Sequence, residues 1–205
     1  VMDRLKDKDK APELETGSVL RTVGDAVPDL STDLLAFFHD RLKVYLRDQG
    51  IRHDIVNLCF PNLETTNLAL DVAKAEALNA VLATEDGENL VQGFKRVGNI
   101  LTQAEAKDGV EYSYGAEVKF AETDEERALF AALDAAEAQI APAMAQERFA
   151  EAMAAMAGLR GPIDAFFEAV QVNADNQIVR RNRLNLLSRI RQTVLQVADL
   201  TRIEG

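Results

Sequence analysis

The sequence predicts an all-α protein. Apolar residues recur at spacings of three and four along nearly the whole chain, which is the spacing of one helix face. Strand-like alternation appears only briefly, around VEYSYGAEVKF. Alanine, the strongest helix former, is abundant between Ala128 and Ala157. At 205 residues the chain is long enough to bury a core as one domain or as two small ones.

The N-terminal part is predicted to hold a linker and two helices. Residues 1–28 are expected to be a linker or the end of a preceding region, because VMDRLKDKDKAPELETG is highly charged and poor in apolar residues. Residues 29–205 are expected to form one helical domain. Its first helix begins at a Ser31/Thr32 cap and ends at Gly50, since hydroxyl groups cap first turns and glycine suits the position after the last turn. A short helix, RHDIVNLCF, stops before Pro61.

Two longer helices are expected next, one from about Leu63 to Ala83 and one after Gly87. The second contains GFKRVGNIL. At about 100° per residue, its apolar side chains share one face, formed by Leu90, Phe94, Val97 and Leu101. The opposite face carries Gln92, Lys95, Arg96 and Asn99. Gly93 and Gly98 each cost about 1 kcal/mol in a helix interior, so we expect another backbone or a ligand to come close to them.

The segment from Lys107 to Thr123 is looser and is predicted to be a surface excursion. TDEE then begins a helix, because acidic residues are favourable in a first turn. The apolar face of this helix consists of Leu129, Phe130, Leu133, Ala136 and Ile140. RFAEAMAAMAGL gives the next helix, and IDAFFEAV gives another after Gly161 and Pro162 at its start.

The last helix is predicted from about Asn176 to Leu200 and has two contrasting faces. Its apolar stripe contains Val179, Leu186, Leu187, Ile190, Val194 and Val197. The opposite face is formed by Arg181, Asn185, Arg189, Gln192 and Gln196, with Arg180 and Arg191 along one edge. Arg183 projects from the middle of the apolar stripe, so we predict that it pairs with a buried carboxylate or caps helix-end carbonyls.

Charge is unevenly distributed along the chain. The net charge of −11 argues against non-specific nucleic-acid binding by bulk electrostatics. Ala104 to Glu151 holds twelve acidic and four basic residues, whereas Ile178 to Ile203 holds six arginines and one acid, Asp199. The sequence therefore predicts an acidic body with a basic C-terminal helix that could offer guanidinium and amide groups to phosphates or unstacked bases.

Catalytic chemistry is not indicated. His39-Asp40 and His53-Asp54 are typical of metal-dependent phosphohydrolases, but such a site needs further histidines and the chain has two. Both histidines are therefore predicted to be surface or helix-end residues, with no bound metal. Cys59 lies in an apolar segment and is predicted to be a buried structural thiol. Because the sequence contains no Walker loop, GxGxxG or nucleophile elbow, the chain alone is predicted to be non-catalytic.

Two further observations predict the cellular compartment of the protein. The single cysteine excludes an internal disulfide and fits a reducing environment. No apolar run approaches the roughly 20 residues that a membrane span requires, and nothing resembles a signal peptide. A cytoplasmic protein without membrane partners is therefore expected.

Three motifs in order resemble a known family. DLLAFFHDRLKVYLRDQGIRHDIVN, then GFKRVGNIL, then PIDAFFEAVQVNADNQIVRRNRLNLLSRIRQTVLQVADLTRIEG are similar to the C-terminal region of bacterial glycyl-tRNA synthetase β subunits. The similarity extends from about Leu30 to Gly205, and the closing RRNRLNLLSRI…VADLTRIEG is its most specific part.

The resemblance implies an all-α anticodon-binding domain of the DALR type, a helical bundle shared with arginyl-tRNA synthetase. It also implies glycine tRNA as a partner, together with a smaller α subunit in a heterotetramer of two α and two β chains. In that family the α subunit holds the class II site that activates glycine with ATP and magnesium, so no cofactor is expected in this part of the chain. The DALR tetrapeptide itself is absent, and its nearest counterpart is RNRLNLL.

The resemblance also assigns a role to the polar helix faces. The expected RNA-binding residues are Gln92, Lys95, Arg96, Asn99, Arg180, Arg181, Asn182, Asn185 and Arg189. Arginine and lysine would hold phosphates, while asparagine and glutamine would read base edges. The two helices would lie side by side and flank the anticodon stem-loop. For Arg96 and Arg181 we favour RNA contact over helix packing, and for Asn99 and Asn182 we favour packing.

Two rival hypotheses belong to other classes. In the first, the chain is a helical interaction module or scaffold within its synthetase and touches RNA little. In the second, it is a fragment of an HD-type hydrolase, which a stoichiometric bound metal ion would reveal.

Overall fold

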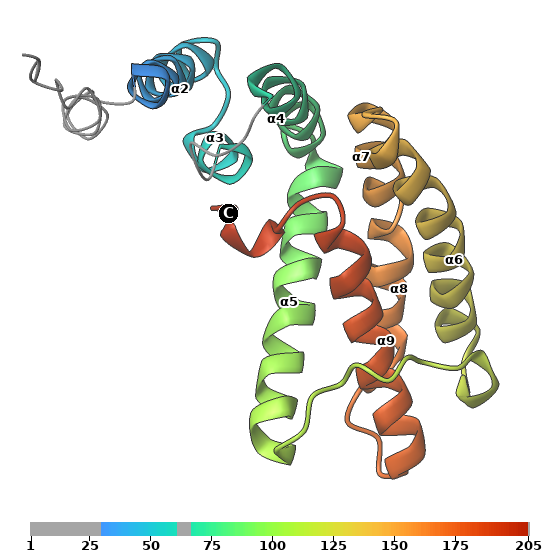
Figure 1. The fold of residues 1–205 in the computed structure, drawn as a ribbon. Coiled ribbons are helices and arrows are strands. Elements are labelled where there is room, and N and C mark those ends of the chain that lie inside the picture. Colours follow the sequence, from blue (N-terminus) through green and yellow to red (C-terminus); the bar gives the residue numbers. More distant parts are fainter. Residues whose placement is uncertain (1–29, 61–66, 205) are drawn as a thin grey trace, which may run out of the picture. The chain divides into compact units, whose positions relative to one another are not determined.

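The computed structural model describes residues 30–60 and 67–204. These residues form helices joined by turns and loops, with no β-strand among them, which confirms the all-α class (Figure 1). The chain divides into two units between residues 38 and 39, within the first described helix. The predicted boundary after residue 28 lies outside the described residues and stays a prediction.

The first described helix, α2 (Leu30–Asp48), ends where the sequence predicts. Gly50 has φ +87°, a left-handed conformation that favours glycine. The predicted start is wrong, because Ser31 and Thr32 lie within the helix. The short helix is confirmed as α3 (His53–Cys59). Arg52 Nη2 donates to Asp54 Oδ2 over 2.6 Å, and the backbone N–H of Glu204 donates to the same oxygen over 2.7 Å, which ties the C-terminal segment to α3.

Helices α4 (Leu68–Leu82) and α5 (Glu85–Asp108) are joined by a tight corner. The predicted start of α4 at Leu63 lies outside the described residues. Asn67 caps α4 and Thr84 caps α5, so α5 begins two residues before Gly87 and not after it. A Cβ at Gly87 would collide with the carbonyl group of Val81. The glycine therefore marks a close approach of two backbones inside the first turn.

The predicted close approaches at the two other glycines of α5 are only partly found. A Cβ at Gly93 would lie 3.3 Å from Ile163 Cγ2, so a side chain of a neighbouring helix, not a backbone, comes near. At Gly98 a Cβ would meet nothing within 4 Å. The expectation for Gly98 is wrong, because that side of α5 is open.

The C-terminal half contains four helices and a long loop. After α5 ends at Gly109 (φ +67°), the loop runs to Thr123 and includes a short 3-10 helix, η1 (Val118–Phe120). Helix α6 (Asp124–Ala145) begins with a capping box between Thr123 and Glu126. The remaining elements are α7 (Phe149–Ala157), α8 (Arg160–Ala169), α9 (Gln177–Leu195) and the 3-10 helix η2 (Leu200–Arg202). Pro162 lies in the first turn of α8, where it needs no N–H donor.

Helix α5 packs beside α9, while α6 packs against α7, α8 and α9. Figure 1 shows the loop after α5 crossing α9 on its way to α6. The predicted apolar stripes of α5, α6 and α9 are confirmed, because every side chain named for them is at most 5% exposed. The core thus holds α9 between α5 and α6 and leaves the covering loop in contact with the polar side of α9.

Candidate nucleic-acid interface

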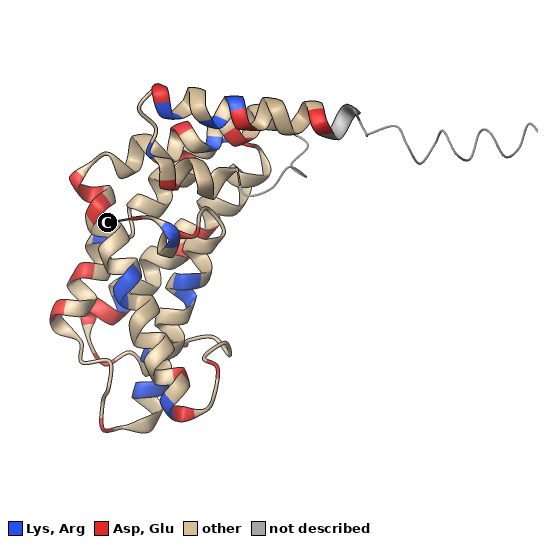
Figure 2. Cartoon of the chain, turned by 90° about the vertical axis from the view of Figure 1, so that its left-hand side faces the viewer, with Lys and Arg blue, Asp and Glu red and all other residues tan. Residues whose placement is uncertain are grey.

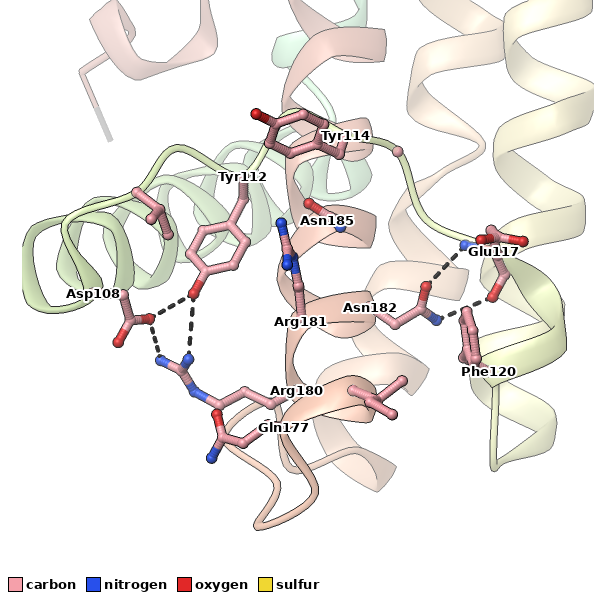
Figure 3. A pocket seen from close by; sticks show the side chains of 13 residues that line it. Asp108, Tyr112, Tyr114, Glu117, Phe120, Gln177, Arg180, Arg181, Asn182 and Asn185 are labelled. Carbon is pink, nitrogen blue, oxygen red and sulfur yellow. Dashed lines mark hydrogen bonds and ion pairs between the residues drawn. The ribbon is translucent and has the colours of Figure 1, made fainter.

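A cavity of about 750 Å³ lies where the loop after α5 meets the first turns of α9 (Figure 3). We call it the Tyr114 cavity. Its lining residues come from the loop and from α9: Asp108, Val110, Tyr112, Tyr114, Gly115, Glu117, Phe120, Gln177, Ile178, Arg180, Arg181, Asn182 and Asn185. The cavity therefore exists only because the loop is held across the polar side of α9.

Asn182 holds the far end of the loop on α9. Its Nδ2 donates to the carbonyl oxygen of Glu117 over 3.1 Å, and the backbone N–H of Glu117 donates to Asn182 Oδ1 over 2.8 Å. Asn182 is 6% exposed, so the side chain is buried and both ends of its carboxamide are satisfied by the loop. This contact fits the preference for a packing role over base reading at this position.

Arg180 holds the near end of the loop. Its Nη2 lies 2.7 Å from Asp108 Oδ2, and the Tyr112 hydroxyl donates to the same oxygen over 2.5 Å. Arg180 Nη1 also donates to the Tyr112 hydroxyl over 3.3 Å. The hydrogen bond from Tyr112, followed by that from Arg180, lowers the pKa of Asp108. The Arg180 guanidinium, predicted to bind RNA, is thus already engaged inside the protein.

Arg181 and Tyr114 form the open part of the cavity. Tyr114 is 82% exposed, and the Arg181 guanidinium carbon lies 5.7 Å from the centre of its ring. Arg181 is exposed as well. Of the five arginines of α9, Arg181 is the one without an ion pair to any residue that the structure describes. Its charge is therefore available to a ligand.

Arg189 is paired with acids of α6. Its Nη2 lies 2.6 Å from Glu137 Oε2 and 2.5 Å from Asp134 Oδ1, and its Nε donates to Glu137 Oε1 over 2.9 Å. Burial alone would raise the pKa of Glu137, but hydrogen bonds from Arg189 and Thr193 hold it below its ordinary value. RNA contact by Arg189 stays a prediction, and a phosphate there would compete with two carboxylates.

Asn185 does not lie on an open face, contrary to the sequence prediction. The side chain is 7% exposed, because the loop covers the part of α9 that carries it. Its Oδ1 is enclosed and has no hydrogen-bond partner among residues 30–60 and 67–204. Helix periodicity placed this residue correctly on the polar side but gave no sign that a loop would cover that side.

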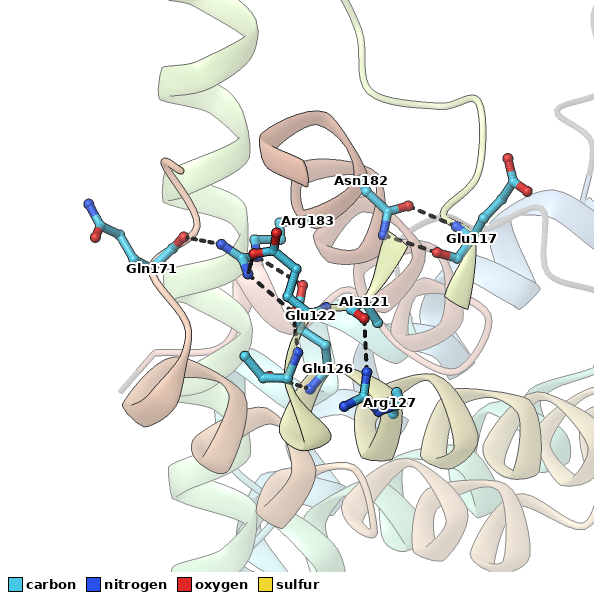
Figure 4. Close-up of polar contacts among 9 residues, drawn as sticks. Glu117, Ala121, Glu122, Glu126, Arg127, Gln171, Asn182 and Arg183 are labelled. Atoms are coloured by element: carbon cyan, nitrogen blue, oxygen red, sulfur yellow. Dashed lines mark hydrogen bonds and ion pairs between the residues drawn. The ribbon is translucent and has the colours of Figure 1, made fainter. Parts of the chain in front are cut away.

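Arg183 pairs with a buried carboxylate, as predicted (Figure 4). Its Nε donates to Glu126 Oε1 over 2.8 Å, and Glu126 is completely buried. Its Nη1 donates to the carbonyl oxygen of Gln171 over 3.0 Å, just beyond the end of α8. The buried-carboxylate role predicted for Arg183 is therefore confirmed, whereas the carbonyl that it contacts lies outside α8 and is not a helix-end carbonyl.

The polar face of α5 lies apart from the Tyr114 cavity. Gln92, Arg96 and Asn99 are exposed and Lys95 is half-buried, as the helix periodicity predicts. The Arg96 guanidinium carbon lies 4.2 Å from the ring centre of Phe167 in α8. Although α5 and α9 are neighbours, Arg96 stacks on α8 whereas Arg181 stacks on the loop. RNA contact by the α5 residues stays a prediction.

The residues considered for other chemistry have ordinary structural positions. His39 is 5% exposed and packs edge-on against Phe60, so its prediction as a surface residue is wrong, whereas His53 is exposed at the start of α3. Cys59 is 5% exposed, which confirms the predicted buried thiol, and burial raises its pKa to about 11. Within residues 30–60 and 67–204, no three metal-ligating side chains come together in a possible metal site. None of the described helices is long and apolar enough to cross a membrane.

The sequence interpretation missed the loop side of the cavity. Tyr112, Tyr114 and Glu117 fell in the segment predicted only as a surface excursion. The available signal was YSYG, which holds two of the three tyrosines of the chain next to a glycine in an otherwise acidic stretch. Exposed aromatic residues in a loop are typical of a binding site.

Comparison with known proteins gives one family. The family model described as "DALR anticodon binding domain" matches residues 90–204, which include the whole Tyr114 cavity. The glycine–tRNA ligase β subunit of Dinoroseobacter shibae is 72% identical over 173 residues, covering 84% of this chain and 24% of that protein.

Further relatives carry the same name. The β subunit of Cereibacter sphaeroides is 69% identical, covering 84% of this chain and 25% of the relative. That of Paracoccus denitrificans is 62% identical, covering 90% of this chain and 27% of the relative. These matches confirm the resemblance seen in the three sequence motifs. The chain spans about a quarter of the length of these relatives.

Proposed function

Because this chain belongs to the family of DALR anticodon-binding domains, we propose that it binds the anticodon stem-loop of a glycine tRNA within a glycine–tRNA ligase. The bound tRNA is thereby positioned for aminoacylation on a separate α subunit, where ATP and magnesium activate glycine. The parent enzyme is a cytoplasmic heterotetramer of two α and two β chains. This part of the β chain supplies binding and no chemistry.

The observation that carries this proposal is the exposed ring of Tyr114 beneath the Arg181 guanidinium at the mouth of the Tyr114 cavity. Proteins that recognise single-stranded RNA stack unpaired bases on aromatic rings and guanidinium planes. Such stacking is worth about 1–3 kcal/mol per base. In this arrangement Tyr114 stacks on an anticodon base, and Arg181 contacts that base or its phosphate.

The surrounding charge favours one docking position over many. The chain carries a net charge of −11, so most of its surface repels RNA. Figure 2 shows basic and acidic positions interspersed along the helices in that view. The unpaired guanidinium of Arg181 beside the exposed Tyr114 therefore attracts RNA at one place on a surface that otherwise repels it. This favours specific over non-specific binding.

Fluorescence anisotropy tests the proposal directly. The chain is titrated against a glycine tRNA and against the same tRNA with its second and third anticodon bases replaced, at low and moderate salt. We expect about tenfold weaker binding of the altered tRNA, or about 1.4 kcal/mol. Arg181→Glu should abolish the difference, whereas a charge reversal at the exposed Arg148, in the turn between α6 and α7, should not. Equal binding of both tRNAs by the unmodified chain would contradict anticodon reading.

One observation supports the alternative hypothesis that the chain is a scaffold within its synthetase. Helix α2 exposes large apolar side chains, among them Val44 at 47% and Tyr45 at 57%, and this chain matches only 24% of the length of a relative. Under this hypothesis α2 docks on another region of the synthetase. Val44→Asp with Tyr45→Asp would then disrupt assembly of the parent enzyme, while Arg181→Glu would leave its tRNA affinity unchanged.

A further inference from the structure

Residues 113–116 of the loop form a strap between the Tyr114 cavity and a second hollow on α9. The second hollow has a volume of about 390 Å³ and includes Ser188 and Gln192 among its lining residues. We call it the Gln192 cavity. Gly115 and Asn185 border both cavities, so the two share a wall. Both volumes fall within the roughly 300–1,000 Å³ usual for small-molecule sites.

The shared wall contains polar atoms that the protein leaves unsatisfied. Asn185 Oδ1 and Ser188 Oγ are enclosed and have no hydrogen-bond partner among the described residues, and their side chains are 7% and 2% exposed. Asn182, one turn earlier on α9, pairs both ends of its carboxamide with Glu117. Because proteins usually satisfy buried polar groups, the contrast points to a ligand that completes Asn185 when it binds.

The chemistry of the Gln192 cavity suits a neutral base edge better than a phosphate. Its charged residues, Arg189 and Glu137, neutralise each other, and Asp134 beside them adds a further negative charge. Gln192 and Gln196 supply amides at the opening. A carboxamide carries an acceptor and donors side by side, which matches the edge of a base that presents an amino group next to a ring nitrogen.

We propose that the two cavities receive two consecutive anticodon bases, one on each side of the strap, and that Asn185 hydrogen-bonds the edge of the base in the Gln192 cavity. The inference rests on the proposed function and assigns the second subsite and its reader. Glycine codons begin with two guanines, so the two anticodon bases that pair with them are cytosines. Cytosine presents its N4 amino group next to N3, and a half turn of the Asn185 amide about its Cβ–Cγ bond brings either end toward them.

A thermodynamic cycle tests this assignment. Binding of the unmodified chain and of Asn185→Leu is measured by anisotropy with intact glycine tRNA and with three tRNAs, each lacking one anticodon base. Leucine has the same number of side-chain heavy atoms as asparagine and the same branch point, but it carries no hydrogen-bonding group. Gln139→Leu, on the exposed side of α6, is the matched control. We expect Asn185→Leu to weaken binding of intact tRNA about tenfold and to leave the melting temperature unchanged or higher, because an unpaired buried amide becomes apolar.

The cycle separates this inference from the proposed function. Removing one of the two cytosine bases, the one that occupies the Gln192 cavity, should weaken binding by the unmodified chain. In Asn185→Leu the same removal should cause no further loss of affinity. Removing the anticodon base that is not one of the two cytosines should change the affinity of the unmodified chain and of Asn185→Leu by the same factor. If the losses from Asn185→Leu and from each cytosine add independently, the subsite assignment is overturned while anticodon binding stands. If the unmodified chain binds all four tRNAs equally, the proposed function fails and this inference with it.

Discussion

Arg183 is a charged residue in the middle of an apolar helix stripe, and its contacts explain why it is there. Glu126 accepts hydrogen bonds from Arg183 Nε and from the backbone N–H groups of Glu122 and Thr123. Burial raises the pKa of Glu126, but these hydrogen bonds outweigh it and hold the carboxylate ionised. The pair fastens the start of α6 to the middle of α9, so each partner depends on the other for its burial.

Arg183→Leu is expected to lower the free energy of unfolding by about 3–5 kcal/mol, because it leaves the Glu126 carboxylate buried without its counter-charge. Thermal or urea unfolding measures the effect. Arg181→Leu is the matched control on the same helix and should change stability by no more than about 0.5 kcal/mol, since Arg181 is exposed. An unchanged melting temperature in Arg183→Leu would show that the pair contributes nothing.

Asn182 is a second residue whose role the contacts define. Asn182 carries no charge and lies one turn from Asn185. Of these two residues only Asn182 holds the loop, through the oxygen and the nitrogen of its carboxamide. We predict that Asn182→Ala raises the hydrogen-exchange rate of the Glu117 backbone amide and weakens tRNA binding, because the loop wall of the Tyr114 cavity is released. Asn185→Ala should leave exchange at Glu117 unchanged. Equal hydrogen-exchange protection of the Glu117 amide in both variants would show that Asn182 does not hold the loop.

At the scale of elements, α6 and α9 are joined by a second ionic contact that depends on pH. The folded-state pKa of Glu137 lies below its ordinary value because Arg189 and Thr193 donate hydrogen bonds to it. A lowered pKa means that the contribution is complete above the ordinary glutamate pKa of about 4.3. It is lost as the pH falls through the lower folded-state pKa.

Glu137→Gln is therefore expected to cost about 1–2 kcal/mol at pH 7, with Asp134 still available to Arg189. The difference in unfolding free energy from the unmodified chain should shrink in acid, as Glu137 of the unmodified chain becomes protonated. Urea unfolding at a series of pH values from neutral to about 3 measures this. A difference that stays constant over the whole range would contradict an ionised Glu137 in the contact.

The sequence predicted the elements of this fold better than their ends. Periodicity gave each described helix, because burial of one helix face requires apolar spacing. Two starts were wrong for a local reason: Ser31 and Thr32 are helical residues, and Gly87 lies inside the first turn of α5, beside a tight corner. The same residue types are common at helix caps and in first turns, so only backbone geometry distinguishes the two positions.

At the scale of the whole molecule, the sequence could not show which charges meet. The acidic segment 104–151 and the basic helix α9 were predicted to be a body and a separate RNA-binding stripe. In the structure Asp108, Glu126, Glu137 and Glu105 pair with Arg180, Arg183, Arg189 and Arg191. Helices α5 and α6 carry these four acids against α9, and periodicity along one helix carries no information about such long-range neighbours. The Tyr114 cavity was missed for the same reason.

This internal pairing sets an upper limit on the salt dependence of tRNA binding. The slope of log K against log salt is about −0.7 for each phosphate neutralised on a single strand. If all five basic residues predicted to bind RNA neutralised phosphates, namely Lys95, Arg96, Arg180, Arg181 and Arg189, the slope would be about −3.5. With Arg180 and Arg189 paired inside the protein, Arg181 with Lys95 and Arg96 gives about −2 at most. We predict the smaller value, with Arg181→Gln reducing its magnitude by about 0.7 and Arg189→Gln leaving it unchanged. A slope near −3.5 would mean that RNA displaces the carboxylates of α5 and α6 from the arginines of α9, and α9 would then be the basic stripe that its sequence alone suggests.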